Sequence, residues 1–429
     1  MRLGNLRNLV FSRLAKSVSY VLAANVFSQV ISFAFLVLVT KNLSIADYGI
    51  YAVFTMIAST ATDLSDMGMN ASVTRFSARY NATGEFDLEN KLISFAFKRK
   101  LRNAVVVNLV VFALSGYISV FFFKTTEFGS LIQLLSVSVL FSLLAGLNDA
   151  ILQGRQEYKK YLTVKFLSGL IYLCLLGVLV FLNKISLFML VLVTLANSFV
   201  YYILSYSLIK YNVLWLKDPP NQIRKDFTGF GRWMVLWSIF AILQSKVDIF
   251  MLAKLTTVEQ VSYYDIAFKL ARPILLVLSA YGQVLNPLLS SCEDRSRIKG
   301  YVRKNKKIVT SFTAILIIGV FSARYLIWML FGNKFSNSVL PLEIILISLC
   351  FFVWELPYNT ALYALNKPHV FSIGSLAGLV CTVVGNMLLL PSFGAVGASL
   401  TYLGAQVVGL SVALIGYRIY MGKENLIDE

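Results

Sequence analysis

The sequence predicts an all-α integral membrane protein with about twelve transmembrane helices in two six-helix lobes. Of its 429 residues, 58% are hydrophobic and 14% charged, and the mean hydropathy of +0.72 is too high for an ordinary soluble domain. Long apolar stretches recur from Val18 to Tyr417, and Lys and Arg residues crowd into every second gap between them. Together these patterns indicate a chain that crosses a membrane many times.

Each apolar stretch is assigned one helix, because a hydrocarbon core of roughly 30 Å requires about 20 apolar residues. The first stretch is too long for a signal peptide and ends without a small-residue cleavage site, so we expect it to span the membrane. The segment 1–16 before it has apolar residues near one helical face and basic residues elsewhere, which predicts a short interfacial helix. The expected helices lie near 17–40, 47–70, 103–123, 128–152, 161–183, 186–209, 232–255, 258–290, 308–331, 337–364, 369–391 and 393–418.

The distribution of basic residues predicts the orientation, because Lys/Arg-rich loops stay in the cytoplasm. The gap at 71–102 is rich in bases and is expected to form a cytoplasmic loop, as is the segment Arg295–Lys307. An even number of helices then places both termini in the cytoplasm. The expected location is the cytoplasmic (inner) membrane. Each outward turn carries a single base, at Lys41, Lys124, Lys184, Lys254 and Lys334.

The chain repeats itself at half length. Lys41–Tyr51 aligns with Lys254–Tyr264, and the same offset aligns Leu152 with Leu365. We therefore expect lobes at 1–211 and 212–429, related as parallel repeats because each half crosses the membrane six times. Two lobes with a cavity between them are the architecture of an alternating-access transporter.

Composition also excludes several function classes. The outward loops are too short to carry the chemistry of an extracytoplasmic enzyme, and the sequence has no Gly-rich phosphate loop, HExxH motif or nucleophile elbow. We expect no enzyme activity. A single histidine and four cysteines without metal-ligand spacing predict no metal or cofactor. The net charge is +18, and the basic residues lie beside membrane segments. This favours anionic headgroups over nucleic acid as partner.

Several stretches resemble the polysaccharide flippase family, which belongs to the multidrug/oligosaccharidyl-lipid/polysaccharide exporter superfamily. They are Lys41–Tyr51, Asp66–Phe76, Leu152–Gly154, Val247–Ser290 and Phe393–Ala398, although Val261-Ser262 replaces the Leu-Gly usual in the family. The resemblance implies a fold like that of multidrug exporters of the MATE type. It also implies that polyprenyl-diphosphate-linked oligosaccharides are moved across the membrane by alternating access, for O-antigen, capsule or exopolysaccharide assembly. Membrane lipids and a glycan polymerase would be its partners, and an H+ or Na+ gradient its driving force.

Charges within the apolar helices are the first candidates for the substrate site, because each is costly in the bilayer. Lys246 and Asp248 lie in the seventh helix, and Asp265, Lys269 and Arg272 share one face of the eighth. The excess of positive charge suits a diphosphate, which Arg can bind through two hydrogen bonds. The alternative is that Asp265 pairs with Lys269 and Lys246 with Asp248, only to hold the helices together.

The remaining candidates are polar residues in other helices. Asn25 and Gln29 would line the cavity from the first helix, or else bond neighbouring helices. Acidic and basic residues after the second helix would guard the cytoplasmic mouth, or else be solvated helix ends. Glu355 is a candidate for ion coupling. The gate candidates are Asp63, Asp66, Arg75 and Arg79.

Two other functions fit parts of the pattern. A cation-coupled multidrug antiporter of the same superfamily would favour an acidic cavity, whereas the charges here are predominantly basic. A membrane glycan polymerase would need a sizeable outward loop, and the predicted outward turns are short.

Overall fold

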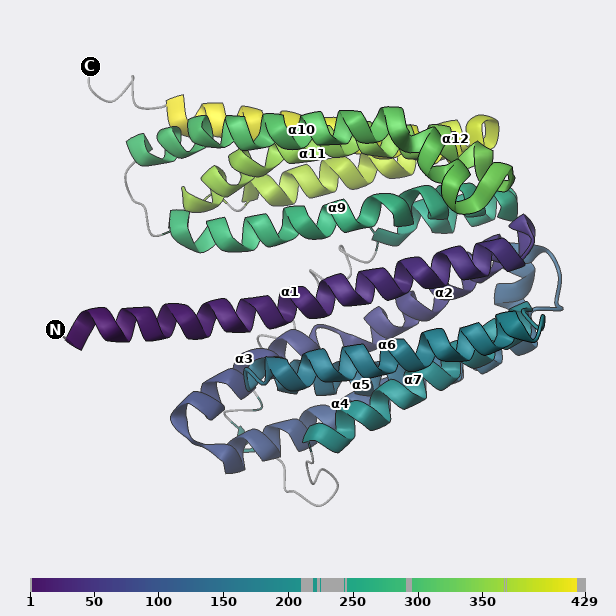
Figure 1. Ribbon diagram of the computed structural model, residues 1–429, viewed down its shortest axis with the longest axis horizontal. Coiled ribbons are helices and arrows are strands. Elements are labelled where there is room, and N and C mark those ends of the chain that lie inside the picture. The colour runs from purple at the N-terminus through teal and green to yellow at the C-terminus, as the bar shows by residue number, and fades with distance from the viewer. Residues whose placement is uncertain are drawn as a thin grey trace. The chain divides into compact units, whose positions relative to one another are not determined.

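The computed structural model describes residues 2–209, 219–221, 224, 243, 245–290, 295–365, 367 and 369–422. Eleven α-helices and one 3-10 helix have both ends within this part of the chain, which confirms the all-helical prediction (Figure 1). Contacts divide the chain into two compact units. Unit 1 is Met1–Leu43 with Phe54–Ile242, and unit 2 is Ser44–Val53 with Leu243–Glu429. The expected lobe boundary at 211/212 lies outside the described residues.

Unit 1 is built around one central helix. Helix α5 packs against α3, α4 and α7, while α1 packs against α6. The bounds are α1 (Arg2–Asn42), α2 (Ile45–Asp66), α3 (Met69–Thr83), α4 (Phe86–Phe123), α5 (Gly129–Gly154), α6 (Tyr158–Phe181) and α7 (Leu187–Ile209). The first residues of α2, up to Val53, belong to unit 2, so this helix contributes to both units.

Unit 2 is likewise centred on one helix, since α11 packs against α9, α10 and α12. Residues 245–255 are helical and precede α9. The bounds are α9 (Val258–Ser290), α10 (Arg295–Phe331), the 3-10 helix η1 (Gly332–Ser338), α11 (Val339–Ala364) and α12 (His369–Gly422). Of the rest of the expected seventh helix, only Leu243 is described. Residues 232–242 and 244 lie outside the described residues.

Helix α12 contains the two helices expected at 369–391 and 393–418. They are joined at Gly394, whose backbone has φ 51° and ψ −127°. A Cβ atom is disfavoured at positive φ, so glycine permits this break. The Gln260 side chain accepts a hydrogen bond from the Ala395 amide at 2.8 Å and fixes the break against α9.

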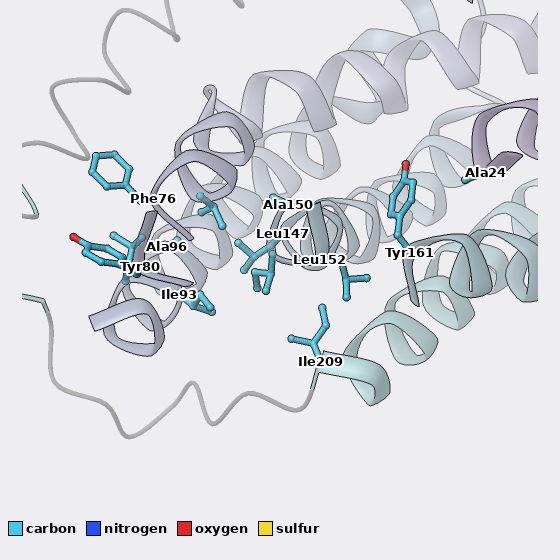
Figure 2. Packing of buried hydrophobic residues seen from close by; sticks show 13 residues of the cluster. Ala24, Phe76, Tyr80, Ile93, Ala96, Leu147, Ala150, Leu152, Tyr161 and Ile209 are labelled. Atoms are coloured by element: carbon cyan, nitrogen blue, oxygen red, sulfur yellow. The ribbon is translucent and has the colours of Figure 1, made fainter. Parts of the chain in front are cut away.

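The charge of the basic segment 71–102 predicted a loop, and this prediction is wrong. The segment forms α3 and the first turns of α4. Gly68 and Gly84, both at positive φ, bound α3. Apolar residues between the charges pack against α5: Figure 2 shows Phe76, Tyr80 and Ile93 in a cluster with Leu147 and Ala150. These buried contacts stabilise helices that apolar run length alone does not reveal.

Two other helices also begin earlier than their apolar runs. Helix α10 starts at Arg295 rather than near 308, because its basic first half is helical too. Helix α1 is continuous from Arg2, so the expected separate interfacial helix is absent from the described part of the chain. Charge marks the end of an apolar run but does not interrupt a helix.

Seven segments of the described residues are long and apolar enough to cross a membrane. Two of them, Ile298–Leu362 and Ser372–Met421, each contain two helices joined by η1 or by the Gly394 break. Helices α2 and α9 are absent from this set, and α9 is rich in charged residues for a membrane helix. The protein is a multi-pass membrane protein.

Candidate functional site

Helix α9 carries an ion pair between Asp265 and Lys269. The two residues are one turn apart, so their side chains meet on one face, with the Lys269 Nζ 2.7 Å from Asp265 Oδ2. The Asp265 side chain is 7% exposed, whereas that of Lys269 is 32% exposed. The carboxylate is thus enclosed while the ammonium keeps an open side.

Tyr48, from the first turn of α2, completes this cluster. Its hydroxyl donates a hydrogen bond to Asp265 Oδ2 at 2.5 Å and accepts one from Lys269 Nζ at 3.1 Å. The Lys269 Nζ also lies 5.4 Å from the centre of the Tyr48 ring, within cation–π range. Tyr48, Asp265 and Lys269 are called the α9 triad below.

Close backbone packing brings Tyr48 to α9. A Cβ atom on the neighbouring Gly49 would overlap the carbonyl oxygen of Val258, so no larger residue fits without a shift. One turn further along α9, the Ser262 hydroxyl donates a hydrogen bond to the Ile45 carbonyl at 2.5 Å. Glycine at position 49 therefore allows the start of α2 to lie directly against α9.

Arg272 follows the α9 triad by one turn on the same face. Its side chain is exposed, and it makes no hydrogen bond or ion pair with the residues that the structure describes. An Arg without such partners retains its hydrogen-bond donors for a ligand. The α9 face thus presents one compensated cation and one available cation.

Asp248 forms a second buried cluster with different partners from those expected. It is 9% exposed and accepts hydrogen bonds from the Tyr264 hydroxyl at 3.0 Å and from Asn386 Nδ2 at 2.8 Å. Lys246 is half-buried two residues earlier, on the helical stretch 245–255. Asp248 therefore does not pair with Lys246, which was the alternative expected. Its partners are two neutral donors, one on α9 and one on α12.

Glu355 lies in the middle of α11, beside Pro357. It is half-buried and accepts a hydrogen bond from Asn359 Nδ2 at 2.7 Å. A Cβ atom on Gly409 of α12 would come within 2.9 Å of Glu355 Oε2, so the absence of a side chain there makes room for the carboxylate.

The candidates from the first lobe lie in unit 1, where they do not form one site. Asn25 is exposed on α1 and Gln29 is half-buried one turn on. Asp66, at the end of α2, pairs with Lys100 of α4 at 2.7 Å, and Lys100 also donates to Asn70 Oδ1 at 2.5 Å. The other gate candidates, on α2 and α3, are exposed: Asp63, Arg75 and Arg79.

Lys100 is a residue that sequence reasoning missed. It is fully buried in unit 1, although it lies in the most basic stretch of the chain and was assigned to a cytoplasmic loop. Its partner Asp66 is far away in sequence, so only the packing of α2 against α4 reveals the pair. A buried lysine paired with an acid holds helices together, and this favours a structural role for Asp66.

Two more ion pairs in unit 1 were also missed. Asp149 of α5 lies 3.2 Å from Lys165 of α6 and accepts a hydrogen bond from the Tyr201 hydroxyl at 2.6 Å. Buried Glu89 is bound by Arg155 Nε at 2.8 Å. In each case the sequence offers a charge but no local partner at helical spacing.

No group of His, Cys, Asp and Glu in the described residues could hold a metal ion.

Long apolar helices that carry buried ion pairs define a polytopic membrane protein. Residues 38–340 match the family described as polysaccharide biosynthesis protein. The chain belongs to this family, which confirms the resemblance seen in the sequence.

Relatives that match over most of their length support the same assignment. The chain is 26% identical over 436 residues to an uncharacterized membrane protein of Methanocaldococcus jannaschii, covering 96% of this chain and all of the relative. It is 21% identical over 398 residues to a protein of Haloferax volcanii described as a probable low-salt glycan biosynthesis flippase, covering 90% of this chain and 79% of the relative.

Solved structures show the same fold. An inward closed conformation of the lipid II flippase MurJ matches with a TM-score of 0.72 and 15% identity, over 93% of this chain and 87% of that one. An inward-facing multidrug resistance MATE transporter of the MOP superfamily matches with a TM-score of 0.70 and 12% identity, over 94% and 96%. The expected MATE-like fold is confirmed.

Proposed function

We propose that this protein moves a polyprenyl-diphosphate-linked oligosaccharide from the cytoplasmic to the outer leaflet of the cytoplasmic membrane. Family membership and the relative described as a glycan biosynthesis flippase support glycan assembly as the process. The fold shared with a lipid II flippase supports a lipid-linked substrate. O-antigen, capsule or exopolysaccharide assembly would consume the product, and a glycan polymerase would be a partner downstream.

The observation that carries this proposal is the arrangement of cations on α9. Lys269 is held in place by Asp265 and Tyr48 yet keeps an open side, and Arg272 one turn on is exposed. A diphosphate carries adjacent negative oxygens, which Arg binds through two parallel hydrogen bonds and Lys as a point charge. An acidic cavity, as a cationic drug would require, does not fit this face.

In the proposed cycle, substrate enters from the cytoplasm and its diphosphate contacts Arg272 and then Lys269. The carboxylate of Asp265 competes with the diphosphate for Lys269, so binding of substrate weakens the α9 triad. Coupling to an H+ or Na+ gradient through Glu355 is part of the proposal. We also propose that both termini lie in the cytoplasm. A cysteine at Thr126 should then label from outside and one at Lys160 should not.

Substitution of the two cations tests the proposal. Arg272→Ala and Lys269→Ala are each expected to reduce surface glycan at least about tenfold, since a charge-assisted contact is worth about 1.4 kcal/mol or more. Arg272→Lys should recover little, because Lys cannot bind two phosphate oxygens in the same fork. Surface glycan and membrane abundance are measured together in cells.

Lys184→Ala is the matched control, because it removes an exposed cation from the turn between α6 and α7. It should leave surface glycan unchanged. Normal glycan in the Arg272→Ala, Lys269→Ala double variant would overturn the proposed role of this face.

A further inference from the structure

Unit 2 contains a large cavity that the proposed transport cycle does not use. It has a volume of about 1040 Å³ and lies where α9 begins, α10 ends, η1 and α11 begin, and α12 breaks at Gly394. The basic half of α10, Arg295–Lys307, is at the opposite end of that helix. With the proposed orientation, this cavity opens at the outer face of the membrane.

The cavity contains one cation and one anion, Arg324 of α10 and Glu343 of α11. Arg324 is exposed and Glu343 half-buried. Neither forms a hydrogen bond or an ion pair with any residue that the structure describes, and they do not pair with each other. Two opposite charges left available in one cavity favour a ligand that carries both signs, because each side chain then gains a partner.

The depth of both charges matches a lipid headgroup. Arg324 lies seven residues before the end of α10 at Phe331, about 10 Å along the axis at ~1.5 Å per residue. Glu343 lies in the second turn of α11. Long side chains this close to a helix end reach the boundary between headgroups and hydrocarbon.

The walls of the cavity provide a surface for lipid chains. Phe321, Tyr325 and Trp328 of α10 line it with exposed fractions of 84%, 63% and 57%. Aromatic side chains of this kind concentrate at the membrane interface, where their rings contact both headgroups and chains. On the polar side, Asn333 and Asn337 of η1 add amide donors and acceptors.

We infer that this cavity binds a zwitterionic phospholipid of the outer leaflet, with its phosphate on Arg324 and its ammonium on Glu343. Its chains lie along Phe321, Tyr325 and Trp328. The inference does not depend on which substrate the protein transports, because none of these residues belongs to the α9 triad. A lipid bound here would connect α10 to α11 at the outer end of unit 2.

Lipid retention tests the assignment. The full chain is reconstituted into nanodiscs containing equal amounts of phosphatidylethanolamine and phosphatidylglycerol. It is then released, and the lipids that stay bound are counted by native mass spectrometry. Wild type should retain phosphatidylethanolamine in preference by about tenfold, the value of one charged contact of 1.4 kcal/mol. Arg324→Gln should reduce retention of both lipids, and Glu343→Gln should remove only the preference.

Arg324→Lys keeps the charge and should preserve phosphate binding even if Arg324→Gln fails to fold, and thermal melting identifies that case. Lys184→Gln, a remote exposed cation, is the control and should behave as wild type. Equal retention of the two lipids by wild type would overturn the inference. So would an unchanged preference in Glu343→Gln, or retention only of a polyprenyl-diphosphate glycan carried over from cells.

Discussion

At the scale of single residues, the Tyr48 hydroxyl determines how the charges of the α9 triad are balanced. It donates to Asp265 and accepts from Lys269, so each charged group has a neutral partner in addition to its opposite charge. A buried ion pair gains stability only when its remaining hydrogen-bonding capacity is satisfied. Tyr48 does this while leaving one side of Lys269 open.

Substitutions within the triad distinguish a substrate site from a structural pair. In Asp265→Asn, Lys269 keeps Tyr48 as acceptor and is partly exposed, so the loss of stability should be below the about 3–5 kcal/mol of a fully buried pair. Lys269→Gln should abolish export, and the double variant should do no better. Export and membrane abundance are measured for all three.

The opposite outcome has a clear meaning. If the Asp265→Asn, Lys269→Gln double variant recovers both abundance and export, the cost lay in the orphan charge alone. The pair would then be a structural connection within α9, and Lys269 would have no role with substrate.

The sequence predicted some of these residues and missed others for one physical reason. Asp265 and Lys269 are one turn apart on a helix, so their pairing follows from local spacing. Tyr48 meets Asp265 across 217 positions, and Asn386 meets Asp248 across 138. Such contacts depend on how helices pack, and helix packing is not encoded in any local pattern.

At the scale of elements, Gly49 determines whether α2 can lie against α9. The Gly49→Ala change should separate the two helices, break the Tyr48–Asp265 hydrogen bond and destabilise the protein by about 1–3 kcal/mol, the usual cost of overpacking. Thermal unfolding in detergent measures the change.

Gly177→Ala in α6 is the matched control, because a Cβ atom there has nothing within 4 Å. It should be neutral or slightly stabilising, since alanine favours helix over glycine by up to about 1 kcal/mol. Equal melting temperatures for Gly49→Ala and wild type would show that the close approach is not required.

Helix positions were predictable to different degrees along the chain. Apolar run length located the cores of α5, α6, α7 and α11, because the hydrocarbon core selects for it. It missed α3 and the first turns of α4 and α10, where basic residues alternate with buried ones such as Val73, Leu92 and Ile298. Their helicity comes from packing against neighbours, which amphipathic periodicity rather than mean hydropathy would indicate.

At the scale of the whole molecule, the two units account for how charges are used. Unit 1 contains buried ion pairs such as Asp66–Lys100 and Glu89–Arg155, and unit 2 contains the Asp265–Lys269 pair. Unit 2 carries Arg272 and Arg324, which make no ion pair with the described part of the chain. We propose that unit 2 supplies the contacts to phosphate, both in transport and at the outer face.

The central claim is that the protein moves a lipid-linked oligosaccharide across the membrane, and transport by the purified protein tests it most directly. Proteoliposomes carry a fluorescent polyprenyl-diphosphate oligosaccharide, and a membrane-impermeant quencher reports how much reaches the outer leaflet. Wild type should expose the inner pool, and Arg272→Ala should slow this at least about tenfold. Labelled phosphatidylethanolamine should stay in place. No movement of the oligosaccharide by wild type, or equal movement of both lipids, would contradict the account.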